Sequence, residues 1–352
     1  MFRNMLQWDA VTQRALQRTT IREIADQAGV SIATVSRVLN GRGDVSDETR
    51  DLVSRVIREN GYTANRNARG LSAGRTGLVG VVVPLVFPAY FAYILAGAAE
   101  ALFERDLQIV LSPTGNEYAR EVSVFNRLHG VTDGSLIILP EESSEELERH
   151  LDNGFRFVVI DPLMQLDERI PSVSAANTSG ADQAMRHLLQ LGHRRIAHIT
   201  GPKGWLATED RRRGYRAALA AAGTLPDPGL EAEAIPEIDS GRDAATALLA
   251  LPDPPTAIFA FNDNIAIGAV QAARARGLRV PDDLSVVGFD DVEHATVVTP
   301  ALTTVRQPLA EMGRTAVSLL SRLMERQSLE TLHVELATRL VVRDSTAPLR
   351  NR

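Results

Sequence analysis

Apolar side chains recur at helical spacing near the start of the chain. Between residues 20 and 28 the apolar positions share one side of a helix: Ile21, Ile24, Ala25 and Ala28. Thr20 precedes this stripe and Glu23 stands three positions after Thr20, which is the pattern of a capping box. We therefore predict a short helix that begins after Thr20 and ends at Gly29, a residue suited to the left-handed conformation of a helix end.

Two further helices are predicted before residue 62. Ser31 can cap the second helix, whose inward side chains are Val35, Val38 and Leu39. Ser46 can cap the third helix, which stops at Gly61 and whose predicted inward side chains are Leu52, Val53, Val56 and Ile57. Two short helices joined by a tight turn with glycine describe a helix-turn-helix, and the third helix completes its small core.

From residue 78 onward, apolar runs of strand length alternate with amphipathic stretches of helical length. The runs lie at residues 78–84, 107–113, 134–140, 157–161, 195–201, 257–263 and 284–291. Residues 179–192 and 262–277 are two of the helical stretches. This alternation predicts parallel sheets that are covered by helices on both faces, and the length fits two such sheets. The predicted fold is an all-α head followed by an α/β body.

The segment from Gly77 to Ala99 has no charged residue and is long enough to be considered as a membrane span. Pro84 and Pro88 interrupt it, its first part is rich in valine, and its second part has helical spacing that ends in charges. We predict a strand, a loop and a helix here. Residues 1–18 lack the apolar core of about 7–15 residues that a secretory signal needs, so we expect an N-terminal extension.

Composition and charge narrow the class of protein. The chain of 352 residues has no cysteine, which excludes disulfides, thiolate metal sites and a cysteine nucleophile. Its seven histidines have no spacing typical of a metal site, and we predict neither a metal nor a cofactor. Residues 1–75 hold 12 arginines against 8 acidic residues, whereas the remainder holds 26 basic and 36 acidic residues. A basic head on an acidic body favours nucleic-acid binding by the head, with chance drift as the alternative.

The outward face of the second helix carries small and hydrogen-bonding side chains. Residues near the start of such a helix can reach base edges in the major groove. Arg37 can pair with guanine, and side chains such as Thr34 and Ser36 can hold phosphates. The alternative is a solvated helix face. The candidate DNA-contacting residues of the head are Thr20, Ser31, Ile32, Ala33, Thr34, Ser36, Arg37 and Asn40.

Polar and aromatic residues collect where the predicted strands of the body end. Ligands of parallel α/β folds bind beyond the carboxyl ends of the strands. Carboxylates, an amide, an arginine and aromatic rings together suit a polyhydroxylated ligand, because polar groups hold hydroxyls and rings cover C–H faces. The alternatives are core packing for the rings and helix caps for the acids, and we assign Asp263 and Asp291 as helix N-caps. The candidate ligand-binding residues are Tyr90, Phe91, Asp161, Trp205, Arg211, Asn262 and Asp290, of which Arg211 is expected near the start of a helix.

Residues 20–84 resemble the DNA-binding head, hinge and first body strand of the lactose-repressor/galactose-repressor (LacI/GalR) family, with "AGVSIATVSRVLNG" as a close match to the helix-turn-helix of that family. The resemblance implies that residues 65–74 form a hinge helix that enters the minor groove at the operator centre. Leu71 stands where the family has a leucine wedge between base pairs. Asn65 and Ala68 belong to the same element, and Ala64 departs from the proline usual before it.

The body resembles the periplasmic-binding-protein-like (type I) effector domain of the same family, which has two lobes. The stretches that carry this are "LGHRRIAHITGP", "DRRRGYRAAL", "AIFAFNDNIAIGAV", "PDDLSVVGFDD" and "TPALTTVRQPLAEMG". Arg211, Asn262 and Asp290 fall on effector-binding positions of the family. The aromatic residue that the family often has before the helix near Ser240 is missing.

The resemblance implies a DNA-binding transcriptional regulator, a repressor that binds a palindromic operator as a dimer and responds to a sugar-like effector. The expected parts are an extension (1–18), a helix-turn-helix domain (19–63), a hinge (64–76) and a two-lobe body (77–348) with crossovers near 174, 304 and 336. A dimer is expected because no terminal leucine heptads follow the body. The expected location is the cytoplasm.

Two other classes of protein are alternatives to a transcriptional regulator. A solute-binding protein for transport needs a secretory signal and leaves the head unexplained. A carbohydrate-active enzyme could use Asp161 or Asp290, but no Ser-His-Asp arrangement, phosphate loop or metal set supports it.

Overall fold

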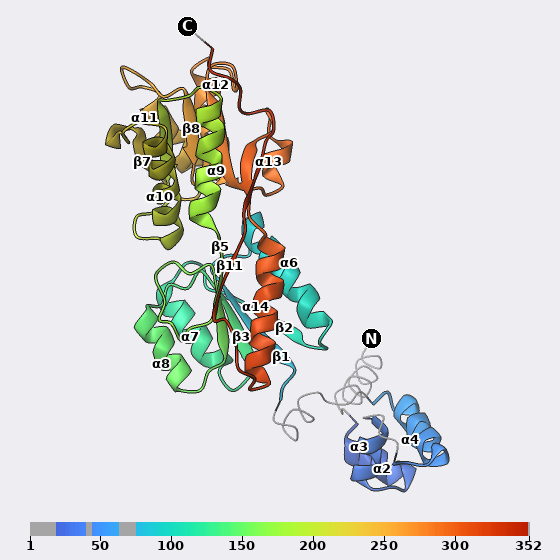
Figure 1. The fold of residues 1–352 in the computed structure, drawn as a ribbon. Coiled ribbons are helices and arrows are strands. Elements are labelled where there is room, and N and C mark those ends of the chain that lie inside the picture. The colour runs from blue at the N-terminus through green and yellow to red at the C-terminus, as the bar shows by residue number, and fades with distance from the viewer. Residues whose placement is uncertain (1–18, 40–43, 63–74, 351–352) are drawn as a thin grey trace, which may run out of the picture. The chain divides into compact units, whose positions relative to one another are not determined.

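Three short helices form the N-terminal unit of the computed structural model, which describes residues 19–39, 44–62 and 75–350. The helices are α2 (Ile21–Ala28), α3 (Ile32–Leu39) and α4 (Asp47–Glu59) (Figure 1). The capping box is confirmed: Glu23 N donates to Thr20 Oγ1 at 3.3 Å, and Thr20 N donates to Glu23 Oε2 at 2.7 Å. Gly29 ends α2 with a φ of 63°.

One small core holds these helices together. Its buried members are Ile24, Ala25, Ala28, Val35, Val53 and Val56. The prediction for Leu52 was wrong, because its side chain is 39% exposed. At 3.6 residues per turn, Leu52 lies roughly a quarter of a turn from the centre of the stripe formed by Val53, Val56 and Ile57, so it falls at the edge of the core.

The second unit, residues 77–352, contains two six-stranded sheets. We call lobe 1 the part built on the sheet of order β11-β5-β4-β3-β1-β2. Its helices are α6 (Ala89–Phe103), α7 (Tyr118–Leu128), α8 (Ser144–Asp152) and α14 (Leu309–Met324). Its strands are β1 (Leu78–Val83), β2 (Gln108–Pro113), β3 (Gly134–Ile138), β4 (Phe157–Ile160), β5 (Ser172–Ala175) and β11 (His333–Leu336).

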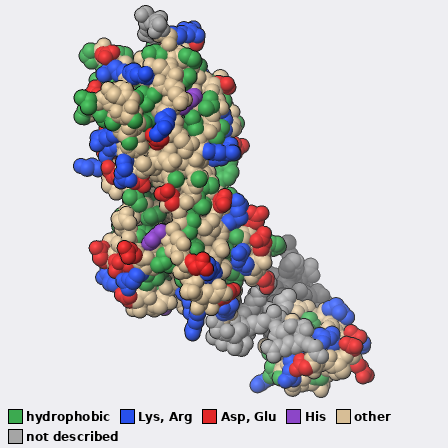
Figure 2. All heavy atoms as spheres, in the orientation of Figure 1, with side chains coloured by type: hydrophobic (Ala, Val, Ile, Leu, Met, Phe, Trp, Pro, Cys, Tyr) green, Lys and Arg blue, Asp and Glu red, His purple; other side chains and the backbone are tan. Residues whose placement is uncertain are grey.

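Lobe 2 is built on the sheet of order β12-β10-β9-β8-β6-β7. Its helices are α9 (Asn177–Gln190), α10 (Leu206–Ala221), α11 (Ile238–Leu248), α12 (Asp263–Ala275) and α13 (His294–Val297), with a 3₁₀ turn at Pro228–Leu230. Its strands are β6 (Ile196–Thr200), β7 (Glu231–Glu233), β8 (Ala257–Ala260), β9 (Ser285–Asp290), β10 (Thr303–Arg306) and β12 (Arg339–Val341). Figure 2 shows charged side chains of both signs over both lobes.

The strands pair in parallel, apart from the antiparallel pair β10–β12. The predicted helix-turn-helix head and α/β body of two parallel sheets are therefore confirmed. The chain passes from lobe to lobe three times: between β5 and α9, between β10 and α14, and between β11 and β12 (Figure 1). Loops that follow strands of both sheets line a common space.

The uncharged segment 77–99 forms β1, a loop and the start of α6, as predicted. Among the described residues, no helix is both long and apolar enough to cross a membrane. Glycines bring α6 against α14: a Cβ on Gly97 would stand 1.8 Å from the carbonyl oxygen of Ala310, and one on Gly313 would stand 2.2 Å from that of Ile94. Only glycine allows this approach, which fixes α14 to the helix that starts at the ligand cleft.

Candidate ligand cleft and nucleic-acid interface

A cleft of about 190 Å³ lies between the two lobes of the body. Lobe 1 contributes the loop and helix after β1 and the loops after β3 and β4, whereas lobe 2 contributes the starts of α10, α11 and α12 and the end of β9. This is where the carboxyl ends of parallel strands place a ligand. All seven candidate ligand-binding residues line it: Tyr90, Phe91, Asp161, Trp205, Arg211, Asn262 and Asp290.

Arg211 forms the floor of the cleft and is 2% exposed. It lies in the second turn of α10, rather than near the helix start as predicted, because α10 already begins at Leu206. Its Nε donates to Asn177 Oδ1 at 2.9 Å, and its Nη1 donates to the carbonyl oxygen of Phe261. The guanidinium carbon lies 3.7 Å from the centroid of the Phe289 ring, a cation–π contact that also orients the group. Burial lowers the pKa of Arg211, while the nearby acids oppose this, so the group stays charged.

Asp161 and Tyr90 form a pair on the lobe 1 side. The Tyr90 hydroxyl donates to Asp161 Oδ2 at 2.6 Å. Asp161 follows β4 with a φ of 53°, a left-handed conformation that few residues other than glycine adopt. Burial raises the pKa of Asp161, and the hydrogen bond from Tyr90 and the charge of Arg211 counter this rise. Burial, followed by the charge of Asp161, raises the pKa of Tyr90 well above its usual value.

Asp290 faces the cleft from lobe 2. Its backbone has a φ of 113°, and its Oδ1 accepts a hydrogen bond from Gln307 Nε2 at 2.7 Å. Burial raises the pKa of the Asp290 carboxyl to about 7, although Arg211 and Gln307 lower it. A buried carboxyl with a pKa near neutrality is common at functional sites.

Two predicted helix caps were wrong. Asn262, not Asp263, is the N-cap of α12, since Asn262 Oδ1 accepts from Ile265 N at 2.9 Å. Asp263 therefore lies inside the first turn, where it is buried and accepts hydrogen bonds from Thr304 Oγ1 at 2.5 Å and Val292 N at 3.0 Å. The side-chain oxygen of Asn262 is used to cap the helix, so its side-chain NH₂ group is left for a ligand in the cleft.

Asp291, the other predicted cap, does not cap a helix. Its carboxylate instead forms ion pairs with Arg306 and Arg343.

Aromatic rings line part of the cleft. Phe91 lines it and also belongs to the lobe 1 core, so the core-packing alternative holds for this ring as well. Trp205 immediately precedes α10 and lies edge-on to Phe261, with centroids 6.3 Å apart. Helix α11 starts at Ile238, and Pro236 and Glu237 line the cleft just before it.

Several residues that line the cleft were not predicted from the sequence. Leu139 follows β3 and Phe261 follows β8, so the same strand-end rule could have found them. Asn177 and Gln307 do not line the cleft but hold Arg211 and Asp290, and they follow β5 and β10, two short strands without a long apolar run. The other additions are Pro84, Leu85, Pro88, Ala89, Asn116, Glu141, Pro162, Leu163, Ala207, Pro236, Glu237, Asn264, Val292 and His294.

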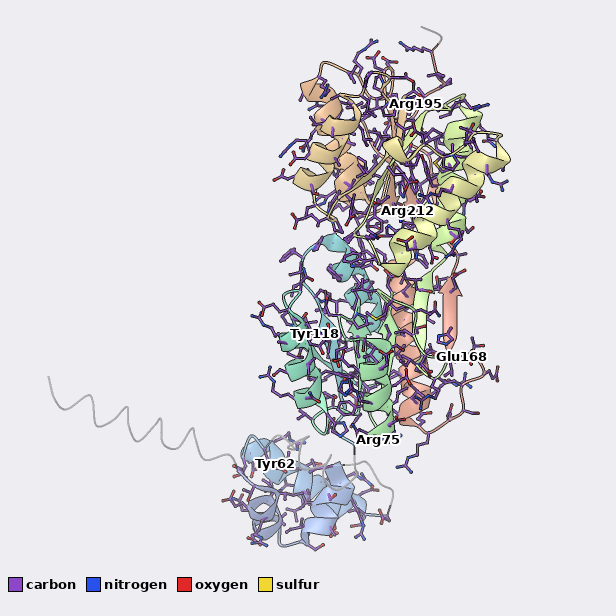
Figure 3. All side chains as sticks on the ribbon, turned by 90° about the vertical axis from the view of Figure 1, so that its left-hand side faces the viewer. Tyr62, Arg75, Tyr118, Glu168, Arg195 and Arg212 are labelled. Atoms are coloured by element: carbon purple, nitrogen blue, oxygen red, sulfur yellow. The ribbon has the colours of Figure 1, made fainter. Side chains whose placement is uncertain are left out.

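The cleft is more acidic than basic. Arg211 is the only lysine or arginine among the described residues that line the cleft, which include the acids Asp161, Asp290, Glu141 and Glu237. The neighbouring arginines of α10 form ion pairs outside the lining: Arg212 Nε lies 3.0 Å from Glu231 Oε2, and Arg213 Nη1 lies 2.9 Å from Asp210 Oδ1. Figure 3 shows Arg212 and Arg195 on lobe 2, and Tyr118 and Glu168 on lobe 1.

Across the described part of the chain, no group of three or more His, Cys, Asp or Glu side chains could hold a metal ion. Two buried histidines have structural partners. His198 stacks on Phe259 with centroids 4.8 Å apart, and burial lowers its pKa to about 3. His193 shares hydrogen bonds with Thr256 and Ser285, each at 3.0 Å.

The head presents the outward face of α3 to solvent. Ile32, Ala33 and Arg37 are exposed, whereas Val35 is buried. Ser31 Oγ accepts from Thr34 N at 3.1 Å, which confirms Ser31 as a cap, and Arg37 Nε lies 3.2 Å from Asp44 Oδ2. Thr20 is exposed and Ser36 half-buried. The predicted contacts Asn40, Asn65, Ala68 and Leu71 lie outside the described residues.

Comparison with known proteins agrees with both parts. Residues 20–65 match the bacterial regulatory proteins of the lacI family, and residues 185–346 match the periplasmic binding protein-like domain. The HTH-type transcriptional regulator DegA of Bacillus subtilis (strain 168) is 36% identical over 335 residues, which are 94% of this chain and 99% of DegA.

Two solved structures of regulators are similar over most of the chain. The transcriptional regulator CelR in complex with cellobiose is 37% identical, with a TM-score of 0.70 over 93% of this chain and 100% of that chain. A lac repressor dimer bound to operator and the anti-inducer ONPF is 28% identical, with a TM-score of 0.85 over 94% of this chain and 100% of that chain.

The relatives are transcriptional regulators, which confirms the choice of this class over a transport protein or an enzyme. The two domain matches follow one another along the chain, and DegA is matched over almost its whole length. The chain therefore belongs to the lacI family of bacterial regulatory proteins and is a DNA-binding transcriptional regulator.

Proposed function

We propose that this regulator is a cytoplasmic repressor that binds palindromic operator DNA as a homodimer, and that an uncharged, sugar-like molecule in the cleft controls its DNA binding. The observation that carries the proposal is the charged group Arg211 set between Asp161 and Asp290, one acid from each lobe. A ligand that bonds to all three side chains contacts both lobes at once.

The chemistry of the cleft favours hydroxyl groups. A hydroxyl donates to one carboxylate and accepts from the guanidinium, so a vicinal diol can bond to both kinds of group. The rings of Trp205, Phe91 and Phe261 provide apolar cover for C–H faces. Anionic ligands such as sugar phosphates are disfavoured, because they would face four acids with one arginine. The cellobiose complex of the relative CelR is consistent with this class of ligand.

An exposed apolar face supports the homodimer. On α6 and the preceding loop, Phe103 and Phe87 are 85% and 83% exposed, and Tyr93 of the same helix is also exposed. The adjacent strand β2, which lies at the edge of its sheet, exposes Leu111. Such a face is unusual on a monomer and suits a partner with the same face. The lac repressor structure is a dimer, which agrees with this proposal.

The proposed role of the head rests on the residues of its helix-turn-helix. Ile32, Ala33 and Arg37 are proposed to contact base edges, and Thr20, Ser31, Thr34, Ser36 and Asn40 are proposed to contact phosphates. For Asn65, Ala68 and Leu71 the proposal rests on the family resemblance, with Leu71 as the minor-groove wedge.

A thermal-shift panel of glucose, ribose, cellobiose and glucose 6-phosphate tests the ligand class, since a ligand that binds only the folded body raises its melting temperature. At least one neutral sugar should raise the melting temperature of the wild type, and the phosphate should not. Arg211→Met should abolish the rise, whereas Arg213→Met, on the surface of the same helix, should keep it. A rise that is equal in Arg211→Met would refute the assignment of the cleft.

A further inference from the structure

An ion triad with a buried central carboxylate lies directly behind the cleft-facing end of β9. The carboxylate of Asp291, 3% exposed, lies between two arginines. Its Oδ1 is 2.5 Å from Arg343 Nη2, and its Oδ2 accepts from Arg306 Nε. Arg343 also donates to the carbonyl oxygen of Leu302 at 2.8 Å. Asp291 therefore joins the end of β9 to two other segments of the chain.

The residue before Asp291 is the cleft residue Asp290, and the two form one strained turn. Their φ values are 113° and 60°, and neither residue is glycine. Consecutive left-handed residues persist only where their surroundings hold them, and such strain gathers at functional sites. Since the two residues share a peptide bond, a backbone shift of Asp290 toward a ligand also displaces the backbone nitrogen of Asp291.

The turn at Asp290 and Asp291 is hydrogen-bonded to the end of β10, where the chain begins its passage to α14 of lobe 1. Asp290 and Arg306 are partners in the register of β9 and β10. Gln307 N donates to the carbonyl oxygen of Asp290 at 3.2 Å, and Gln307 Nε2 donates to its carboxylate at 2.7 Å. The pair Asp290–Asp291 is thus attached to the pair Gln307–Arg306 through backbone and side chains.

The two arginines of the triad lie at, or just beyond, the lobe 2 ends of two passages between the lobes. After Arg306 and Gln307 the chain enters α14 of lobe 1, which packs on α6, the helix that presents Tyr90 to the cleft (Figure 1). Arg343 follows β12, the strand that ends the passage from β11. Asp291 consequently bonds to the lobe 2 ends of two of the three passages, at a point next to the cleft.

A stabilising role is not enough to account for the presence of this triad. Replacing a buried ion pair by apolar groups of similar volume is often neutral or stabilising, so such a pair is weak evidence for a stabilising role. The neighbouring bonding is also incomplete: Gln307 Oε1 is buried and has no hydrogen-bond partner among the described residues. An unused acceptor beside Asp290 is suited to a second arrangement of this turn.

We propose that Asp291 is a positioning residue that couples ligand occupancy at Asp290 to the passages between the lobes, and so to DNA binding. The inference rests on the proposed function, because it requires a ligand in the cleft. Asp291 does not line the cleft, so removing its charge should spare ligand affinity and reduce the response.

Two readouts separate these effects. Trp8 and Trp205 are the two tryptophans, and a Trp8→Phe background leaves Trp205 as the fluorescent reporter at the cleft wall. The probe is the panel sugar that gives the largest thermal shift. DNA affinity is measured by anisotropy with a fluorescein-labelled duplex that the wild-type protein selects from a random pool. In the wild type the sugar should change the DNA dissociation constant by about 5–150-fold.

In Asp291→Asn the dissociation constant of the sugar should stay within about threefold of the wild type, while the sugar-induced change in DNA affinity should fall below about twofold. Asp253→Asn is the matched control, because it removes an exposed partner of Arg195 in the same lobe, and it should keep the full response.

A full response in Asp291→Asn overturns the inference alone. If that variant does not fold, Arg306→Met removes the more exposed partner, and a full response there overturns it as well. A wild type that no panel sugar affects in either readout overturns the proposed function instead.

Discussion

The hydroxyl of Tyr90, at the start of α6, donates to the carboxylate of Asp161, at the end of β4, over 2.6 Å. Tyr90→Phe removes this donor from a buried carboxylate while keeping the ring. The free energy of unfolding should fall by about 1–3 kcal/mol, since a buried acceptor loses a hydrogen bond. Urea unfolding measures the change. Tyr118→Phe, which removes an exposed hydrogen bond to Glu146, should change it by less than about 0.5 kcal/mol.

The pH dependence of ligand affinity should reveal Asp290. Its carboxyl has a pKa of about 7 because it is buried, and sugar hydroxyls donate to the ionised form. The affinity for the sugar should therefore rise as the pH rises through 7. Below pH 7 the rise should be at most about tenfold per pH unit, because one carboxyl ionises. Calorimetry in buffers of different ionisation enthalpy should show that binding releases protons.

The control for this pH effect is Asp290→Asn. Burial also raises the pKa of Asp161 in the cleft, and burial and the charge of Asp290 raise that of Asp263, so residual pH dependence in the variant reports on these two acids. A wild-type affinity that falls as the pH rises from 6 to 8 would contradict the assignment.

Glu121 should make the body less stable at alkaline pH. This buried residue of α7 accepts hydrogen bonds from the backbone N–H groups of Glu141 and Glu142 at 2.8 and 3.0 Å, and burial raises its pKa to about 7. The folded state therefore holds a proton that the unfolded state releases above about pH 4.5, so stability is lost as the pH rises from there through 7.

Glu121→Gln keeps an acceptor for both N–H groups and removes the titration. The free energy of unfolding of the variant minus that of the wild type should increase by about 1–3 kcal/mol from pH 5 to pH 8. Urea unfolding at the two pH values measures this difference. An identical change in both proteins would show that Glu121 does not titrate in this range.

The apolar face of α6 should hold the dimer together. Phe103→Glu places a charge on that face in both subunits, so burial of the two rings, about 2–3 kcal/mol each, is lost. Sedimentation should show a dissociation constant raised by at least about 100-fold. Leu225→Glu changes a residue of lobe 2 that is 89% exposed and should leave the dimer intact. A dimer that survives Phe103→Glu would place the interface elsewhere.

Apolar patterning predicted the elements where local chemistry was strong. The caps Thr20, Ser31 and Ser46 and the valine-rich strand β1 stand where expected. The strands β5, β7, β10, β11 and β12 were missed because they are three or four residues long and carry several polar side chains. Their pairing depends on neighbouring strands, which the local sequence does not contain.

The candidate site was predictable in part for the same reason. The strand-end rule brought Asp161 and Asp290 together because their strands carry long apolar runs. It did not show which of the adjacent residues Asn262 and Asp263 would cap α12, since either side chain can do so. Asn177 and Gln307 were missed because their role appears only once distant segments are packed together.

The most direct measurement of the central claim is the affinity for the selected DNA duplex with and without the panel sugar, in the wild type, Arg211→Met and Arg213→Met. The sugar should change the dissociation constant at least about fivefold in the wild type and in Arg213→Met, and less than about twofold in Arg211→Met. DNA affinity without sugar should be the same in all three. An equal response in Arg211→Met, or none in the wild type with any panel sugar, would contradict control of DNA binding through this cleft.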